Sequence, residues 1–302
     1  MSNKISRQVI PLILVVNLFA SGTAQEVRED SLEGRPTQLL IRCDDMGMSH
    51  SVNMAFKELM ENGIPFSASV MFACPWYQEA VEILREHPEV SVGVHLTLNS
   101  EWNNFKWGPV CAKGNVSSLV DDEGYFFPSR DLFFENKPKL SQVKRELRAQ
   151  IEKATRTGLR IDYVDYHMGT AVSTPELRAI VEKLAGEYGL GISRYFGEVD
   201  TEGIYSVPYE DKKDSLIAYI KYFDPEIVNL LVFHLGMDTP ELSAMQDLNQ
   251  HGLPEMSKHR DAELRALTSP EYRANLDEHK IHTITYRELI ARLGLEQMEA
   301  RK

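Results

Sequence analysis

The stretch LLIRCDDMGMSH, residues 39–50, places an apolar run directly before two adjacent carboxylates, Asp44 and Asp45. A short apolar run that ends at polar residues and a glycine is typical of a strand buried in a parallel sheet. Two neighbouring carboxylates repel each other, and their burial is costly unless a positive charge compensates it. The stretch therefore predicts a strand that ends at a functional site.

Outward from this strand, apolar runs alternate with amphipathic helical patterns along the chain. Such units predict an α/β fold with a parallel sheet and helices outside it, either a barrel or a doubly wound sheet. A loop-rich insertion near 99–139 interrupts the alternation. We expect strands at 38–43, 66–73, 90–98, 161–167, 191–196, 226–234 and 280–286, and helices at 51–63, 76–88, 140–158, 174–189, 209–223, 258–267 and 287–294.

The N-terminal residues have the pattern of an export signal. Lys4 and Arg7 precede the apolar stretch VIPLILVVNLFA, and small residues follow in SGTAQ. Because this stretch is short for a membrane span, we expect a signal peptide over 1–24, cleaved after Ala24, rather than an uncleaved anchor. Residues 25–302 are then expected to form a single catalytic domain, exported to the periplasm or the medium without stable membrane insertion.

The charge of the chain excludes some classes of partner. The 302 residues carry a formal net charge of -12. Nucleic acid or an anionic membrane would require a basic surface, so we expect neither as a partner. A neutral or cationic substrate fits this charge better, and a homo-oligomer is compatible with the sequence.

Ionisable side chains recur at the carboxyl ends of separate predicted strands. Asp44 and Asp45 end one strand, and His95, His167 and His234 lie at the ends of three others. These strand ends meet at one edge of a parallel sheet, where α/β folds place their active sites. One such histidine alone would more often be a core residue, but the coincidence of four strand ends favours a site.

This set of side chains suits a metal-dependent hydrolase. One carboxylate and two neutral imidazoles can hold a divalent ion and leave positions open for water and substrate, and we expect Asp45, His95 and His167 in this role. Asp44 is then available as a base towards water made more acidic by the ion. His234 can protonate a leaving group, because imidazole titrates near neutral pH.

The same residues carry a resemblance to a known family. RCDDMG, VSVGVHLTL, LRAQIEKATRTGLRIDYVDYH and LVFHLG resemble, in order and at similar spacing, the motifs of the YdjC/ChbG family of carbohydrate deacetylases. The similarity runs from about Leu39 to Leu293, nearly the whole expected mature chain. One such motif is a weak signal, whereas four in order are fairly specific.

The resemblance implies a single-domain distorted (β/α) barrel of the polysaccharide deacetylase-like type. It also implies one divalent metal ion, Mg²⁺ or Zn²⁺, and removal of acetyl groups from N-acetylated amino sugars or oligosaccharides, such as chitooligosaccharides. By motif, Asp45, His95 and His167 match the ligands and Asp44 matches the catalytic base. His234 falls where the family has a His-Pro-Gly.

The chain departs from the family pattern at several positions. RCDDMG stands in place of NADDFG, which keeps both aspartates. Gly169 and Ala171 occupy positions where the family motif has further histidines, and Leu235 replaces the proline after His234. We therefore expect a divergent branch whose substrate differs from that of the better-known members.

Other side chains are candidates for supporting roles. Asp165, two residues before His167, is placed to orient a metal ligand, or else to cap or support the fold. Arg194 lies near a predicted strand end, where it could hold the base or contact substrate. Trp102, Trp107 and Tyr125, from the insertion, could form a wall that stacks on a sugar ring, or else pack within the loop.

Two other functions remain open from the sequence. A metal-dependent phosphoesterase also places Asp and His ligands on a barrel rim, but it usually has two metals and further cations for phosphate. The chain has one such ligand set and no glycine-rich phosphate loop. A non-catalytic carbohydrate-binding protein of the same fold is the second alternative, although Asp44, Asp45 and His95 are all present.

Overall fold

Strand β1 (Thr37–Met46) pairs with three other strands and organises the sheet. It runs parallel to β7 along its length, to β8 along Thr37–Leu40, and to β2 from Arg42 onward. The strand order is β5-β4-β3-β2-β1-β7-β6, and all pairings are parallel. The strands are β2 (Ser67–Val70), β3 (Ser91–Leu96), β4 (Ile161–Tyr166), β5 (Gly191–Ile192), β6 (Val199–Asp200), β7 (Val228–His234) and β8 (Ile281–Ile284).

The computed structural model describes residues 36–250 and 252–299, so the predicted signal peptide lies outside the described residues. The sequence prediction of an α/β fold with a parallel sheet is confirmed. The barrel is incomplete, because β5 and β6 end the strand order and do not pair with each other in the described chain. No helix in the same residues is long and apolar enough to cross a membrane.

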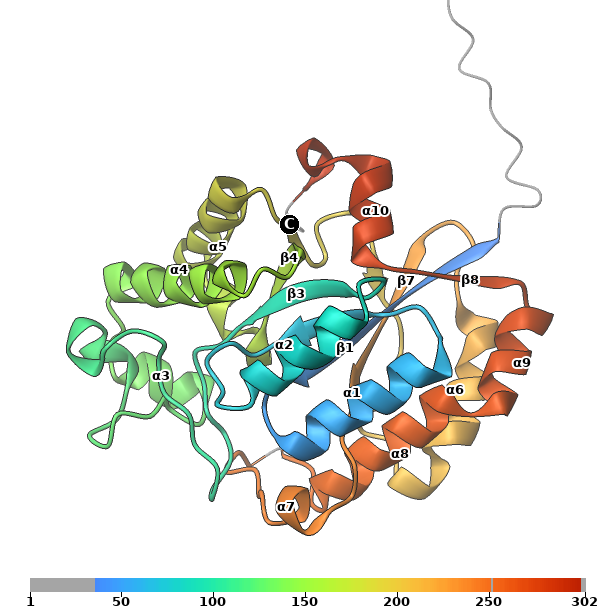
Figure 1. The fold of residues 1–302 in the computed structure, drawn as a ribbon, viewed down its shortest axis with the longest axis horizontal. Helices are drawn as coiled ribbons and strands as arrows, with labels where there is room; N and C mark the ends of the chain where they lie inside the picture. Colours follow the sequence, from blue (N-terminus) through green and yellow to red (C-terminus); the bar gives the residue numbers. More distant parts are fainter. Residues whose placement is uncertain (1–35, 251, 300–302) are drawn as a thin grey trace, which may run out of the picture. The chain divides into compact units, whose positions relative to one another are not determined.

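The helices lie outside the sheet, and α1 packs against α2, α8 and β1 (Figure 1). Helix α1 begins after Ser49, whose hydroxyl accepts from the Val52 N–H, and ends at Gly63 in a left-handed conformation. The helices are α1 (His50–Asn62), α2 (Tyr77–Glu86), α3 (Arg130–Glu135), α4 (Leu140–Arg156), α5 (Pro175–Tyr188), α6 (Lys212–Tyr219), α7 (Pro240–Ser243), α8 (Met256–Thr268), α9 (Pro270–Glu278) and α10 (Tyr286–Leu293).

Several predicted boundaries differ from the structure. The strand expected at 191–196 is only two residues long, because Arg194 adopts a left-handed backbone with φ of 71°. The helix expected at 209–223 is a 3₁₀ turn, α6 and a second 3₁₀ turn in succession. Helix α9 was not expected; it begins with Pro270 after the Ser269 cap, which separates it from α8.

The two faces of β1 pack into different cores. Leu39, Ile41 and Cys43 belong to the larger core, whereas Leu40 packs in a smaller one with Tyr163 and Tyr286. Successive side chains of a strand point to opposite faces. Arg42 and Asp44 therefore continue the row begun by Leu40, from the smaller core to the carboxyl end of the sheet.

The smaller core depends on a glycine in β3. Gly93 pairs in register with Tyr163, and a Cβ added to Gly93 would lie 2.4 Å from the Tyr163 ring. That ring is fully buried, stacks at 4.3 Å between centroids on Tyr286, and bonds Ser69 through its hydroxyl at 2.8 Å. The ring has no space to move without breaking these contacts.

We predict that Gly93→Ala lowers the free energy of unfolding by about 1–3 kcal/mol through overpacking. Gly186→Ala is the matched control, because Gly186 lies in α5 with no atom within 4 Å of the added methyl. The control should gain about 0.5–1 kcal/mol from helix propensity. Urea denaturation measures both, and equal stability of the two variants would contradict this account of the smaller core.

Candidate active site

The carboxyl ends of β1, β3, β4 and β7 meet at one cavity of about 260 Å³. The structure thus brings together the five side chains that sequence analysis placed at separate strand ends. The lining residues are Asp44, Asp45, His95, Glu101, Trp102, His167, Met168, Tyr205, His234, Asp247, Met256 and Arg260. Of these, Asp247 and Met256 also line a larger neighbouring cavity of about 810 Å³.

A break in strand geometry lets two adjacent aspartates reach the same cavity. In a regular strand, Asp44 and Asp45 would point to opposite faces. Asp45 instead has a left-handed backbone with φ of 73°, and the pairing of β1 with β2 shifts register between Cys43 and Met46. Aspartate tolerates this conformation better than most residues, so the local sequence accommodates the irregularity.

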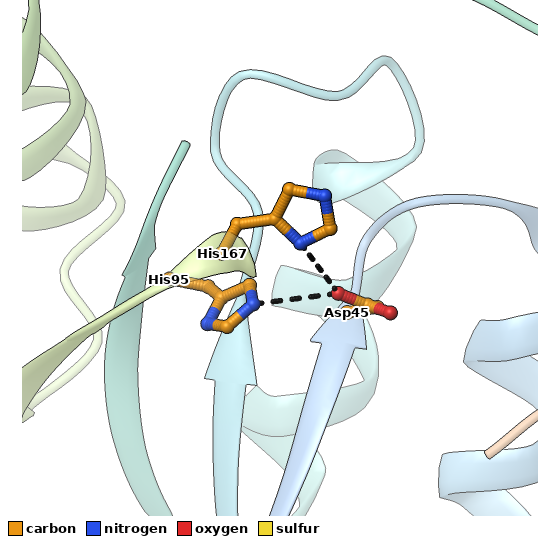
Figure 2. Close-up of side chains that lie close together, drawn as sticks. All are labelled: Asp45, His95 and His167. Atoms are coloured by element: carbon orange, nitrogen blue, oxygen red, sulfur yellow. Dashed lines mark ion pairs between the residues drawn. The ribbon is translucent and has the colours of Figure 1, made fainter. Parts of the chain in front are cut away.

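Asp45, His95 and His167 face one another (Figure 2). The Asp45 Oδ1 atom lies 3.4 Å from His95 Nε2 and 3.3 Å from His167 Nδ1. The other oxygen, Oδ2, accepts a hydrogen bond from Arg260 Nη2 at 2.6 Å. All three ligand candidates are buried, and one atom from each lies within 4.8 Å of the others.

Each histidine also contacts a carboxylate through its other ring nitrogen. His95 Nδ1 lies 3.0 Å from Asp165 Oδ1, and His167 Nε2 lies 2.8 Å from Glu101 Oε2. This arrangement is the one that protein metal sites use to fix the tautomer and orientation of ligating histidines. Asp165 thus occupies the orienting position that the sequence suggested for it.

The three donors fit one divalent ion. Ligand atoms at about 2.0–2.2 Å from an ion lie about 3–3.5 Å from each other, and Asp45 Oδ1 lies at 3.4 and 3.3 Å from the two histidine nitrogens. Asp45 Oδ1 is buried and has no hydrogen-bond partner among the described residues, so it is available as a ligand. Two imidazoles and one carboxylate are a donor set suited to divalent transition metals.

Asp44 is held in a different way. Arg42, two residues earlier in β1, binds both oxygens of Asp44 at 2.7 and 2.8 Å and also lies 3.1 Å from Asp165. Burial alone would raise the pKa of Asp44, but the positive charges around it, with Arg42 the strongest, together outweigh burial and lower the pKa to about 2. Asp44, His95 and Asp165 also cluster closely. The Arg42 guanidinium already pairs with both carboxylates there, which favours the Asp45 cluster as the metal site.

The buried charged groups of the site do not balance, because negative groups outnumber positive ones. Four buried carboxylates face two buried guanidinium groups: Asp44, Asp45, Glu101 and Asp165 against Arg42 and Arg260. Burial lowers the pKa of His95, yet Asp165 and Asp44 raise it well above the usual value. The pKa of His167 is raised in the same way: burial lowers it, but the neighbouring carboxylates, Glu101 first, raise it to about 9. Without an ion, His95 and His167 thus both tend to be protonated. These two protons carry the same charge that a divalent cation would supply.

His234 ends β7 opposite Asp44 in the strand register. Its backbone N–H donates to Glu263 Oε2 at 2.7 Å, and its ring contacts the Tyr205 ring edge-on at 5.3 Å between centroids. The ring nitrogen Nδ1 is buried without a hydrogen-bond partner in the described residues. The imidazole therefore enters the cavity with its orientation set by packing.

Of the remaining predicted residues, only Trp102 lines the cavity. Arg260 lies over the ring of Trp102, and Trp107 packs edge-on against His167 without lining the cavity. Tyr125 is 38% exposed and does not line the cavity. Arg194 binds Asp200 at 2.6 and 2.7 Å, so Arg42 rather than Arg194 holds the base candidate Asp44.

Three of the positions that depart from the family motif, Gly169, Ala171 and Leu235, do not line the cavity. Gly169 has φ of 69°, and a Cβ there would lie 3.0 Å from Arg130, which donates to the Met168 carbonyl. Ala171 and Leu235 are fully buried in the larger core. A histidine at 169 would have to displace the Arg130 guanidinium, and one at 171 would have to replace a fully buried alanine.

Sequence analysis missed four charged residues of the site: Arg42, Glu101, Arg260 and Asp247. Arg42 was detectable, because it lies two positions before Asp44 and so on the same face of the strand. Glu101 comes from the irregular segment after β3, and Arg260 comes from α8, more than 200 residues away from Asp45. Only the packing of these segments reveals their contacts with His167 and Asp45.

The chain is similar to known proteins over most of its length. The carbohydrate deacetylase of Brevibacillus brevis is 29% identical over 267 residues, which is 83% of this chain and 99% of that protein. The carbohydrate deacetylase of Enterococcus faecalis is 28% identical, across 83% of this chain and 98% of its own. A crystal structure from Enterococcus faecalis V583, named as a candidate cellobiose-phosphate cleavage protein, shares the fold at a TM-score of 0.68 and 24% identity, with 84% and 99% covered.

A family model described as YdjC-like protein matches residues 38–278, which include all the strands except β8 and every side chain that lines the cavity. The match thus spans most of the chain and the whole site. The protein therefore belongs to the YdjC-like family.

Proposed function

We propose that this protein is a metal-dependent carbohydrate deacetylase that removes acetyl groups from N-acetylated amino sugars or oligosaccharides. The observation that carries the proposal is the cluster of Asp45, His95 and His167, in which each histidine has a carboxylate on its other nitrogen. The names of the relatives from Brevibacillus brevis and Enterococcus faecalis support the substrate class. Export through a signal peptide over 1–24 remains part of the proposal.

Asp45, His95 and His167 would hold the ion. Two imidazole nitrogens among three donors favour zinc over magnesium, which prefers oxygen ligands. Once bound, a divalent ion supplies positive charge that polarises an acyl carbonyl and stabilises negative charge developing on its oxygen. Arg260 and Glu101 keep the ligands in place by binding Asp45 and His167 from outside the cluster.

The chain itself supplies the proton transfers. Asp44 is ionised because Arg42 keeps its pKa low, so its carboxylate can accept a proton from the attacking water. The water oxygen bonds to the acyl carbon, and the C–N bond breaks when the carbonyl re-forms. His234, on β7 beside Asp44 in the strand register, donates a proton to the departing amine, and the acetyl group leaves as acetic acid, which ionises to acetate. Tyr205 offers aromatic surface for the sugar, whereas Trp102 is only 1% exposed and Arg260 lies over its ring.

The two alternative functions fit the cavity less well. A phosphoesterase needs cations for the phosphate, yet Arg42 and Arg260 already bind carboxylates of the site. The excess negative charge of the buried groups also disfavours an anionic substrate. A protein that only binds carbohydrate would not need a base held ionised beside a metal cluster.

We predict that metal binding at pH 7 releases about two protons per ion. His95 and His167 have raised pKa values in the metal-free protein and must lose their protons to ligate. Affinity therefore rises with pH and keeps rising towards the pKa of about 9 for His167, and it weakens in acid. Calorimetry in buffers of different ionisation enthalpy measures the proton count.

Glu101→Gln provides the matched variant, because it removes the carboxylate that raises the His167 pKa. Proton release in this variant should fall towards one. His50→Gln, an exposed histidine outside the cavity, should leave the count unchanged. Metal binding without proton release in the unmodified protein would argue against the histidine ligands.

We also predict metal-dependent acetate release from N-acetylated oligosaccharides by the purified protein, stripped of metal and resupplied with zinc, magnesium, manganese or cobalt. Asp44→Asn should keep the metal and lose turnover by about 10²–10⁴-fold, as expected for a lost general base. Asp45→Asn should lose the metal itself. Exposed Asp131 on α3 offers a control, and Asp131→Asn should retain full activity. Metal binding without acetate release from any substrate would overturn the deacetylase proposal.

A further inference from the structure

A buried lysine behind the cavity connects two elements of the site. Lys212, the first residue of α6, has no exposed surface and does not line the cavity. Its Nζ atom donates to the carbonyls of Ile204 and Tyr205 at 2.6 and 2.8 Å and lies 3.1 Å from Glu263 Oε1. All three ammonium protons thus have acceptors.

Both sets of contacts lead to His234. The second oxygen of Glu263 accepts the backbone N–H of His234 at 2.7 Å. Tyr205, whose carbonyl Lys212 holds, places its ring edge-on against the His234 imidazole. Lys212 therefore fixes, through one atom, the backbone of His234 and the ring that packs on it.

The His234 ring has little else to orient it. Its Nδ1 atom has no hydrogen-bond partner within the described chain, unlike the ring nitrogens of His95 and His167, which contact carboxylates. Burying an ammonium group costs several kcal/mol unless its partners are ideally placed. A buried pair often contributes no net stability relative to apolar residues, which points to a role other than stability.

We propose that Lys212 is a positioning residue for His234, which it holds in line with the departing amine through Glu263 and the Tyr205 loop. This inference rests on the proposed function, in which His234 is the general acid. Loss of Lys212 should slow protonation of the leaving group. Metal binding and substrate binding should be unchanged.

The test compares two substrates of Lys212→Met. An N-acetylated oligosaccharide needs a proton on its amine leaving group, whereas 4-nitrophenyl acetate releases a stable phenolate that needs none. We expect kcat for the amide to fall about 10²-fold, the size of effect seen for a small misplacement of a catalytic group. KM, metal affinity and hydrolysis of the ester should stay within about twofold of the unmodified protein.

Two further variants separate positioning from folding. Lys213→Met removes the neighbouring lysine, whose exposed side chain pairs with Glu271, and should change neither activity. Lys212→Met combined with Glu263→Met removes both buried charges and leaves neither unpaired, so the fold should survive. The double variant should show the same loss for the amide and the same retention for the ester.

The orientation of His234 gives a readout independent of activity. With ¹⁵N-labelled histidine, the His234 ring should give one set of NMR signals in the unmodified protein and in Lys213→Met, and broadened or split signals in Lys212→Met. Equal losses on both substrates, unchanged amide turnover or an unchanged His234 spectrum would overturn the positioning role. If the unmodified protein releases no acetate, the proposed function fails, and the spectrum still decides whether Lys212 orients His234.

Discussion

The burial of four carboxylates at one edge of a parallel sheet is the constraint on which the rest of the site depends. Asp44, Asp45, Glu101 and Asp165 are each at most 4% exposed, so none is stabilised by bulk water. Arg42 and Arg260 bind three of them, and the two histidines contact Asp45, Asp165 and Glu101. The remaining excess of negative charge is what makes the centre of this cluster suitable for a cation.

Two elements, β1 and α8, hold this cluster together. Strand β1 supplies Arg42, Asp44 and Asp45 within four residues, and the irregular backbone at Asp45 turns both aspartates to one cavity. Helix α8 supplies Arg260 to Asp45 and, one turn later, Glu263 to the backbone of His234. The ends of β1 and β7 are therefore fixed to the same helix, so the candidate ligand Asp45 and the acid candidate His234 have a common support.

The sequence predicts those site residues that follow directly from the pattern of a single strand. Strand ends carrying Asp44, Asp45, His95, His167 and His234 could be read from apolar runs, because parallel strands must bring their carboxyl ends to one edge. The contacts of Glu101, Arg260 and Lys212 could not be predicted from the sequence, because each contact depends on how segments distant in the chain pack together. For Arg194, the strand-end pattern suggested a place in the site, but its left-handed backbone ends β5 and its side chain binds Asp200.

Two neighbouring residues in the segment after β3 have different roles in the site. Glu101 binds the ligand His167, and Trp102 forms part of the cavity wall. Both are tied to residues 247 and 248, because Leu248 donates to the Glu101 carbonyl and Trp102 bridges to Asp247. A change of substrate range made through this loop would thus also alter the surroundings of His167, one of the three proposed ligands. Under the proposed function, substrate selectivity and metal preference would therefore change together.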